Sequence, residues 1–79
     1  MKIMESVLKE TIRRNIIAKR KELKMTQTDL AERIGSKKNT IASWEQGLAT
    51  PDIDTIAQLV SIFDMDVHEF TGIPPKENP

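Results

Sequence analysis

A chain of 79 residues with no cysteine has room for one domain, which must be stable without disulfides or zinc–thiolate sites. Its 12 basic and 12 acidic residues give a formal net charge of zero, but the two signs are separated along the chain. Residues 1–45 hold 11 basic and 6 acidic residues, a net charge of +5 (11 − 6), and residues 46–79 hold 1 basic and 6 acidic residues, a net charge of −5 (1 − 6). No apolar run is long enough for a membrane span or a signal peptide, so we expect a cytoplasmic protein without a membrane partner.

The first predicted helix spans about residues 5–23. Its apolar stripe, at about 100° per residue, consists of Leu8, Ile12, Ile16 and Leu23. Arg20 falls in the middle of this stripe, where a guanidinium needs a carboxylate partner or must extend to solvent. We therefore expect an acidic partner for Arg20 from elsewhere in the chain.

A short second helix follows at about residues 27–34. Thr26 is a good N-cap, and Asp29 three residues later completes a capping pattern. The apolar face of this helix comprises Leu30, Ala31 and Ile34. Gly35 is then expected to end the helix, because glycine adopts the left-handed conformation that helix ends favour.

The third predicted helix, about residues 38–46, has two different faces. On a helical wheel that starts at Lys38, one face is small and polar, covers about 0° to 140°, and consists of Lys38, Ala42, Gln46, Asn39 and Ser43. The opposite face, at about 200° to 300°, consists of Thr40, Trp44 and Ile41. The polar face fits solvated surface, but it also offers the donors and acceptors that meet base edges.

The fourth predicted helix begins after Asp52, its expected N-cap. One stripe along it consists of Ile53, Ile56, Ala57, Val60 and Phe63. Leu59 and Ile62 lie off this stripe. Apolar residues on a second face indicate either a partner or contacts with neighbouring helices in so small a domain.

Asp66 and Glu69 predict a capping box for a last short helix, which carries Val67 and Phe70 and ends near Gly72. Residues 73–79 contain three prolines and are expected to form a flexible or extended tail.

The stretch Met25–Gly35, followed by Asn39–Gly47, resembles the Cro and phage-repressor helix-turn-helix family, also called the XRE family. The motifs that carry the resemblance are Thr26-Gln27, Leu30-Ala31, Gly35, Thr40-Ile41, Trp44-Glu45, Gly47, Pro51 and a Val-x-x-Phe ending. The resemblance implies an all-α, compact five-helix bundle of the lambda-repressor-like type, with the helix-turn-helix at about residues 27–46. We accordingly divide the chain into an extension (1–11) that continues into the first helix, a DNA-binding domain (12–72) and the tail (73–79).

The family's third helix enters the DNA major groove while the second lies across the backbone. Carried over position by position, the resemblance implies base contacts by Lys38, Asn39 and Ser43. Backbone contacts are implied for Gln27, Lys37, Thr40 and Gln46. Lysine can donate to guanine, and asparagine can bond adenine through two hydrogen bonds. The basic first half of the chain favours the same polyanionic partner, although alone it fits ordinary solvated charge equally well.

The resemblance also implies a structural ion pair between Arg20 and Glu45. Trp44 could serve as a stacking platform for a single strand, but its position on the Ile41 face favours a core role. A sequence-specific regulator, in particular a repressor, is thus expected to bind an operator-like palindromic duplex as a homodimer. The expected dimer interface consists of Leu59, Ile62 and Phe63.

Enzyme chemistry has little support in this sequence, which lacks Cys and Tyr and has one histidine, His68, at the start of a predicted helix. We expect no catalytic residues, no metal site and no cofactor. The alternative function is a protein-interaction module of the same fold, such as an antitoxin-like protein or an antagonist, with a protein partner in place of DNA.

Overall fold

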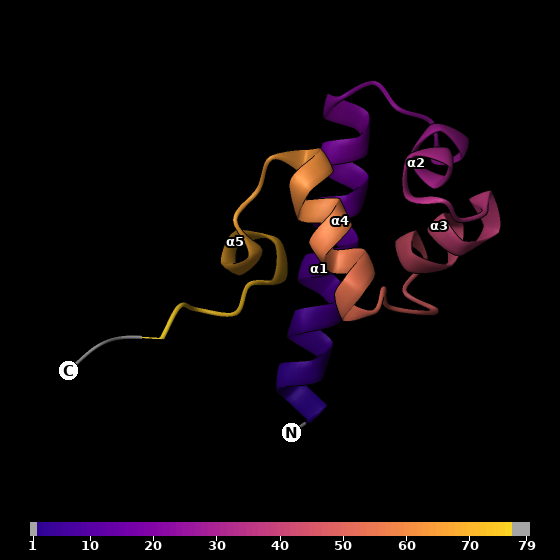
Figure 1. Cartoon of the computed structure of the whole chain (residues 1–79). Helices are drawn as coiled ribbons and strands as arrows, with labels where there is room; N and C mark the ends of the chain where they lie inside the picture. The colour runs from indigo at the N-terminus through magenta and orange to yellow at the C-terminus, as the bar shows by residue number, and fades with distance from the viewer. Residues whose placement is uncertain (1, 77–79) are drawn as a thin grey trace.

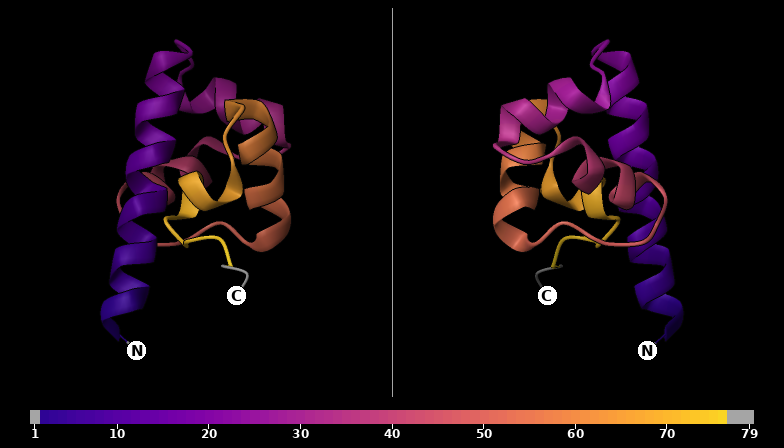
Figure 2. Two further views of the ribbon diagram at one scale, coloured as in Figure 1. Left: turned by 90° about the vertical axis from the view of Figure 1, so that its left-hand side faces the viewer. Right: turned by 90° about the vertical axis from the view of Figure 1, so that its right-hand side faces the viewer.

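The computed structural model describes the backbone of residues 2–76 and the side chains of residues 6–76. In this range the chain forms five helices and no strand, which confirms the expected all-α architecture. The helices are α1 (Lys2–Glu22), α2 (Gln27–Ile34), α3 (Lys38–Glu45), α4 (Ile53–Phe63) and α5 (Val67–Thr71). In the view of Figure 1, α2 and α3 lie on one side of the long α1 and α5 lies on the other. Figure 2 shows α1 along one edge of the molecule, with the shorter helices packed beside it. None of these helices is long and apolar enough to cross a membrane.

The bounds of α1 differ in detail from expectation. α1 begins at Lys2, earlier than the expected start near residue 5, so residues 2–11 of the extension are helical and continue into the rest of the first helix, as expected. The helix ends at Glu22, and Leu23, which was expected on the apolar stripe, is 47% exposed because it lies past this end. Residues 73–76 of the predicted tail follow α5 without further helix. The rest of the tail, residues 77–79, lies outside the described residues, as does residue 1.

The ends of α2 are fixed by the local signals that the sequence carries. The Thr26 hydroxyl accepts a hydrogen bond from the Asp29 N–H (3.0 Å), and the Asp29 carboxylate accepts one from the Thr26 N–H (2.9 Å). This is the predicted capping box. Gly35 ends the helix with φ 69°, a left-handed conformation that a side chain would strain.

The caps of α4 and α5 are also aspartates. Asp52 accepts a hydrogen bond from the Thr55 N–H (2.9 Å), as expected. Asp66 caps α5, but its carboxylate accepts from the His68 N–H (2.7 Å), not from Glu69. The predicted box with Glu69 is therefore wrong, because the cap of this five-residue helix closes at its second N–H group.

Ten buried apolar side chains from all five helices form one core. They are Ile12, Ile16, Leu30, Ala31, Ile41, Trp44, Ile56, Leu59, Phe63 and Phe70. Trp44 is only 6% exposed, which confirms its interpretation as a core residue. The rings of Phe63 and Phe70 lie 6.1 Å apart at 44° and join α4 to α5.

The face that α4 buries matches the predicted stripe only in part: Ile56 and Phe63 are buried as expected. Leu59, expected off the stripe, is fully buried, whereas Ile53, expected on it, is 74% exposed. On the helical wheel the buried side is rotated from the predicted one by about 60°. Apolar residues occupy more than half of the circumference of α4, so hydropathy alone does not fix its rotation; packing against both α2 and α5 does.

We predict that Leu59→Ala lowers the free energy of unfolding by about 2 to 5 kcal/mol, because it leaves a cavity in the core. Ile62→Ala, on the partly exposed side of the same helix, should cost clearly less. Urea denaturation at constant protein concentration measures both. Equal losses would show that α4 is rotated as the hydropathy pattern first indicated.

Candidate nucleic-acid interface

The helix pair α2–α3 is joined by a tight turn that holds the two helices against each other. Gly35 starts this turn, and the Ser36 N–H donates to the Ala31 carbonyl oxygen (2.8 Å). Lys37 then adopts an extended conformation (φ −115°, ψ 151°) and precedes α3 without a side-chain cap. The pair lies where the sequence predicted it, except that Gln46 follows α3 as its C-cap and is not its last residue.

One side of α3 is buried and the other faces solvent. Ile41 is fully buried and Trp44 nearly so, whereas Lys38 and Asn39 are exposed and Ser43 is half-buried. The three side chains expected to contact bases thus lie away from the core. Lys37 and Gln46, expected to contact the DNA backbone, are also exposed at the two ends of α3.

Thr40, which was also expected to contact the DNA backbone, does not lie on the exposed face of α3. Its half-buried side chain lines a hollow of about 360 Å³ with Ile34 and Trp44, which Thr55 of α4 helps to close. The structure therefore places Thr40 beside α4 and not on the face of Lys38 and Asn39.

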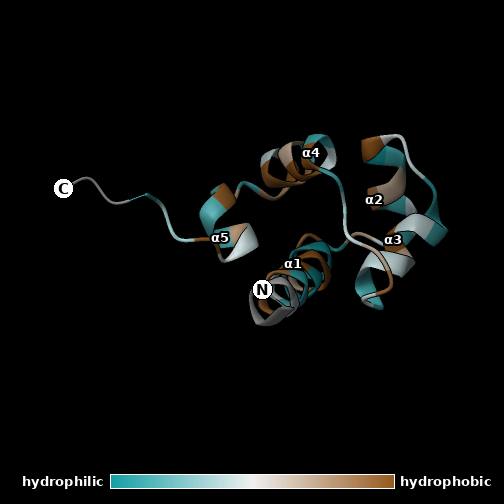
Figure 3. Ribbon diagram, turned by 90° about the horizontal axis from the view of Figure 1, so that it is seen from below, coloured by the Kyte–Doolittle hydropathy of each residue, from teal (hydrophilic) through white to brown (hydrophobic). Residues whose placement is uncertain are grey.

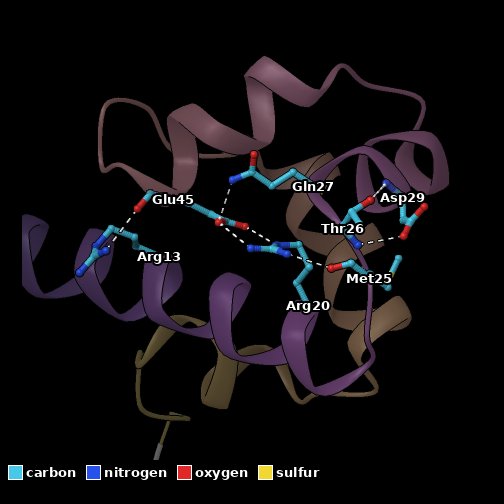
Figure 4. A network of polar contacts seen from close by, with 7 residues as sticks. All are labelled: Arg13, Arg20, Met25, Thr26, Gln27, Asp29 and Glu45. Carbon is cyan, nitrogen blue, oxygen red and sulfur yellow. Dashed lines mark hydrogen bonds and ion pairs between the residues drawn. The ribbon is translucent and has the colours of Figure 1, made fainter.

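The expected ion pair between Arg20 and Glu45 is present and nearly buried (Figure 4). The guanidinium donates twice to the carboxylate, from Nε (2.7 Å) and Nη2 (3.0 Å), and its Nη1 donates to the Met25 carbonyl oxygen (2.8 Å). The side chains are only 12% and 9% exposed. The pair thus joins the end of α1 to the end of α3, and it explains the arginine on the apolar stripe.

Gln27, the expected phosphate contact at the start of α2, makes a contact that the sequence reasoning missed. Its Nε2 donates to Glu45 Oε1 (3.0 Å), so one carboxylate binds both Arg20 and Gln27 (Figure 4). The side chain remains partly exposed. Gln27 and Glu45 are 18 residues apart, and no local pattern signals a contact across that separation.

Arg13 is a second contact that the sequence did not reveal. Its Nη1 donates to the carbonyl oxygen of Glu45 (3.2 Å) and so caps the end of α3 from α1 (Figure 4). Glu10, one turn earlier, holds the guanidinium with two hydrogen bonds of 3.1 and 2.7 Å. The hydrogen bonds from Arg13 and Arg14 lower the pKa of Glu10 to about 2.

The electrostatics around Glu45 favour its ionised form. Burial alone would raise the pKa of this carboxyl, but hydrogen bonds from Arg20 and Gln27 outweigh that effect. The positive charges of Arg20 and Lys21 add to the lowering. The net result is a pKa below the usual value.

Two of the three residues expected at a dimer interface do not lie on the surface of the chain. Leu59 is fully buried and Phe63 is 4% exposed, so both belong to the core of the single chain and cannot meet a second one. Ile62 packs against this core and stays partly exposed.

The single histidine, His68, lies with Nδ1 3.0 Å from the carbonyl oxygen of Ile73, beside the start of the tail.

A capped helix, a glycine turn and a second helix with a free polar face make up the helix-turn-helix class of DNA-binding folds. The helix-turn-helix family model matches residues 16–70, which is more than half of the chain. The chain therefore belongs to this family and is a DNA-binding regulator of the XRE type. No curated protein and no solved structure gave a significant match.

We predict that Arg20→Met and Glu45→Leu each lower the free energy of unfolding by about 3 to 5 kcal/mol, because each leaves one buried charge unpaired. The double variant should lose much less than the sum, since both charges are then gone. Denaturant unfolding of the three variants and the wild type gives the coupling energy. Strictly additive losses would exclude a structural role for the pair.

Acid should weaken the fold through Glu45. Because its pKa is lowered by folding, its contribution is fully present above the usual value of 4.5 and is lost as the pH falls through the folded pKa. We therefore expect the stability difference between the wild type and Glu45→Gln to shrink as the pH drops below 4.5. Urea titrations at a series of pH values measure it; a difference that is independent of pH would contradict the lowered pKa.

Proposed function

We propose that this protein binds double-stranded DNA sequence-specifically, with α3 in the major groove, and represses transcription as a homodimer on a palindromic operator. The observation that carries the proposal is that α3 has one buried apolar face and one exposed polar face. Ile41 and Trp44 anchor it in the core, while Lys38 and Asn39 point away with no partner among the hydrogen bonds and ion pairs of the described residues. The repressor role rests on the resemblance to phage repressors, and the cytoplasmic location is part of the same proposal.

In the proposed complex, Lys38, Asn39 and Ser43 read base edges, since their donors and acceptors match the patterns that base pairs present in the major groove. Lys37, Gln27 and Gln46 position the helix on phosphates. Thr40 has a smaller part in this arrangement, because it lies toward α4.

Lys21 joins the proposed backbone contacts. It is exposed, and it belongs to the basic last turn of α1, directly after Arg20, which binds Glu45 at the end of α3. A cation on this side of α1 would meet a duplex that lies along α2 and α3. Such contacts strengthen binding to every sequence alike.

Base readout and backbone binding should separate experimentally. We expect Lys38→Ala and Asn39→Ala each to remove about 1 to 3 kcal/mol of discrimination at one base pair, with the fold intact because both side chains are exposed. Lys37→Ala should weaken all duplexes alike and reduce the slope of log affinity against log salt by about 0.9.

The measurement begins with selection of preferred sequences from a random duplex pool, followed by titration of preferred and scrambled duplexes at several salt concentrations. Lys76→Ala is the matched control, since it removes an exposed cation that lies beyond the helices and should leave both affinity and slope unchanged. If Lys38 and Asn39 can both be replaced without changing the preferred sequence, α3 does not read DNA and the protein-interaction module becomes the better explanation.

A further inference from the structure

The C-terminal end of α3 is completed by a side chain from α1. The last four carbonyl oxygens of an α-helix have no partner within the helix itself. In α3, three of them accept hydrogen bonds from the backbone N–H groups of residues 46–48. The remaining one, that of Glu45, accepts a hydrogen bond from Nη1 of Arg13 (3.2 Å). A cation in this place is also favourable toward the negative end of the helix dipole.

The guanidinium of Arg13 is held from its other side as well. Glu10 accepts hydrogen bonds from its Nε (3.1 Å) and its Nη2 (2.7 Å), which leaves Nη1 to reach α3. A planar guanidinium can make these contacts at once because its donors form a rigid fork. The chain after α3 also runs close beside the stem of Arg13, since a Cβ on Gly47 would lie 3.6 Å from Arg13 Cδ.

The part of α1 that carries Arg13 is itself firmly packed. Ile12 and Ile16, before and after Arg13 on this helix, are only 3% and 0% exposed. Nδ2 of Asn15 donates to two carbonyl oxygens of α5, at 3.2 and 2.8 Å. Figure 3, seen from below, shows α1 between α3 and α5, both of which it contacts. α1 is therefore a fixed support from which Arg13 can hold the end of α3.

We propose that Arg13 is a positioning residue for base readout, which fixes the C-terminal end of α3 and so determines how Ser43 meets its base pair. The inference rests on the proposed function, in which Ser43 reads a base edge. Ser43 lies in the last turn of α3, two residues before Glu45. Lys38 begins the helix, about 7.5 Å from Ser43 along its axis. Loss of the support at one end should therefore disturb Ser43 more than Lys38, because a readout side chain is only as precise as the groups that hold it.

The ion pair between Arg20 and Glu45 does not replace this contact. Arg20 binds the carboxylate, which several rotatable bonds separate from the helix, whereas Arg13 binds the backbone of α3 directly. Arg13 and Glu10 also precede residues 16–70, the stretch that the family model matches. The proposed role of Arg13 thus rests on contacts of this chain and not on a position shared with the family.

The first measurement is amide hydrogen exchange of the full chain without DNA. Arg13→Met keeps an apolar stem but removes the donor, and the fold should be kept because the side chain is already 32% exposed. The N–H groups of residues 46–48 should exchange about 3- to 10-fold faster, the factor that one hydrogen bond is typically worth, while those of α2 keep their rates. Glu10→Gln, which loosens the guanidinium but leaves it present, should give a smaller increase at the same N–H groups.

Arg14→Met is the matched control. It removes the same charge from a neighbouring residue that also bonds Glu10 (2.8 Å), but its side chain is 74% exposed. Exchange at the end of α3 should stay as in the wild type. General attraction to a polyanion should fall equally in Arg13→Met and Arg14→Met, because each loses one cation.

The second measurement is discrimination between duplexes. Ser43→Ala identifies the base pair that Ser43 reads, as the one at which the preference is lost. Arg13→Met should reduce discrimination at that base pair by about 3- to 10-fold and leave the base pair that Lys38 reads unchanged. Ser43→Ala should then cost little more in the Arg13→Met background, since both changes act on one contact.

Two results overturn the proposal. One is unchanged exchange at residues 46–48 in Arg13→Met, whatever the DNA measurements give. The other is an equal loss of affinity for all duplexes in Arg13→Met and Arg14→Met with no loss of discrimination, which would make Arg13 a phosphate contact only. If exchange rises as expected but neither the wild type nor any variant prefers a duplex sequence, the proposed function fails. The role of Arg13 in readout then fails with it, while its support of α3 stands.

Discussion

The carboxylate of Glu45 is the group on which the arrangement of the helix-turn-helix depends. It accepts hydrogen bonds from Arg20 at the end of α1 and from Gln27 at the start of α2, while the backbone carbonyl of the same residue accepts one from Arg13. One residue at the end of α3 is therefore held from two other helices. A carboxylate in this place is stable only because it is almost completely paired, since a buried charge without partners carries a large free-energy cost.

The parts of the fold that the sequence predicted well have causes that lie within a few residues. Thr26, Asp29 and Gly35 define α2 through caps that act locally, and Arg20 on an apolar stripe indicated a missing acidic partner. The family resemblance supplied Glu45 as that partner. The rotation of α4 was not predictable in this way, because apolar residues surround most of that helix. Only its packing against α2 and α5 decides that Leu59 is buried and Ile53 exposed.

In the candidate site, too, the local features could be predicted from the sequence, whereas the contacts between distant residues could not. That Lys38 and Asn39 face solvent followed from the periodicity of α3, because Ile41 and Trp44 had to be buried. The bond from Gln27 to Glu45 joins residues far apart in the chain, and their approach results from how α2 packs on α3. Periodicity can assign a side chain to a face of a helix, but it does not say which distant group that side chain meets.

The bond that holds Gln27 has a consequence for the energetics of the proposed complex. A free glutamine loses conformational entropy when it is ordered, at a cost of up to about 2 kcal/mol. Because Glu45 already fixes this side chain, that loss belongs to folding, and in the proposed complex the amide would meet a phosphate in a preorganised position. The exposed Lys38 and Asn39 are not held in this manner, so in the proposed complex their rotamers would be ordered only on binding. The proposed complex thus combines a rigid anchor on the backbone of the duplex with adaptable side chains in its groove.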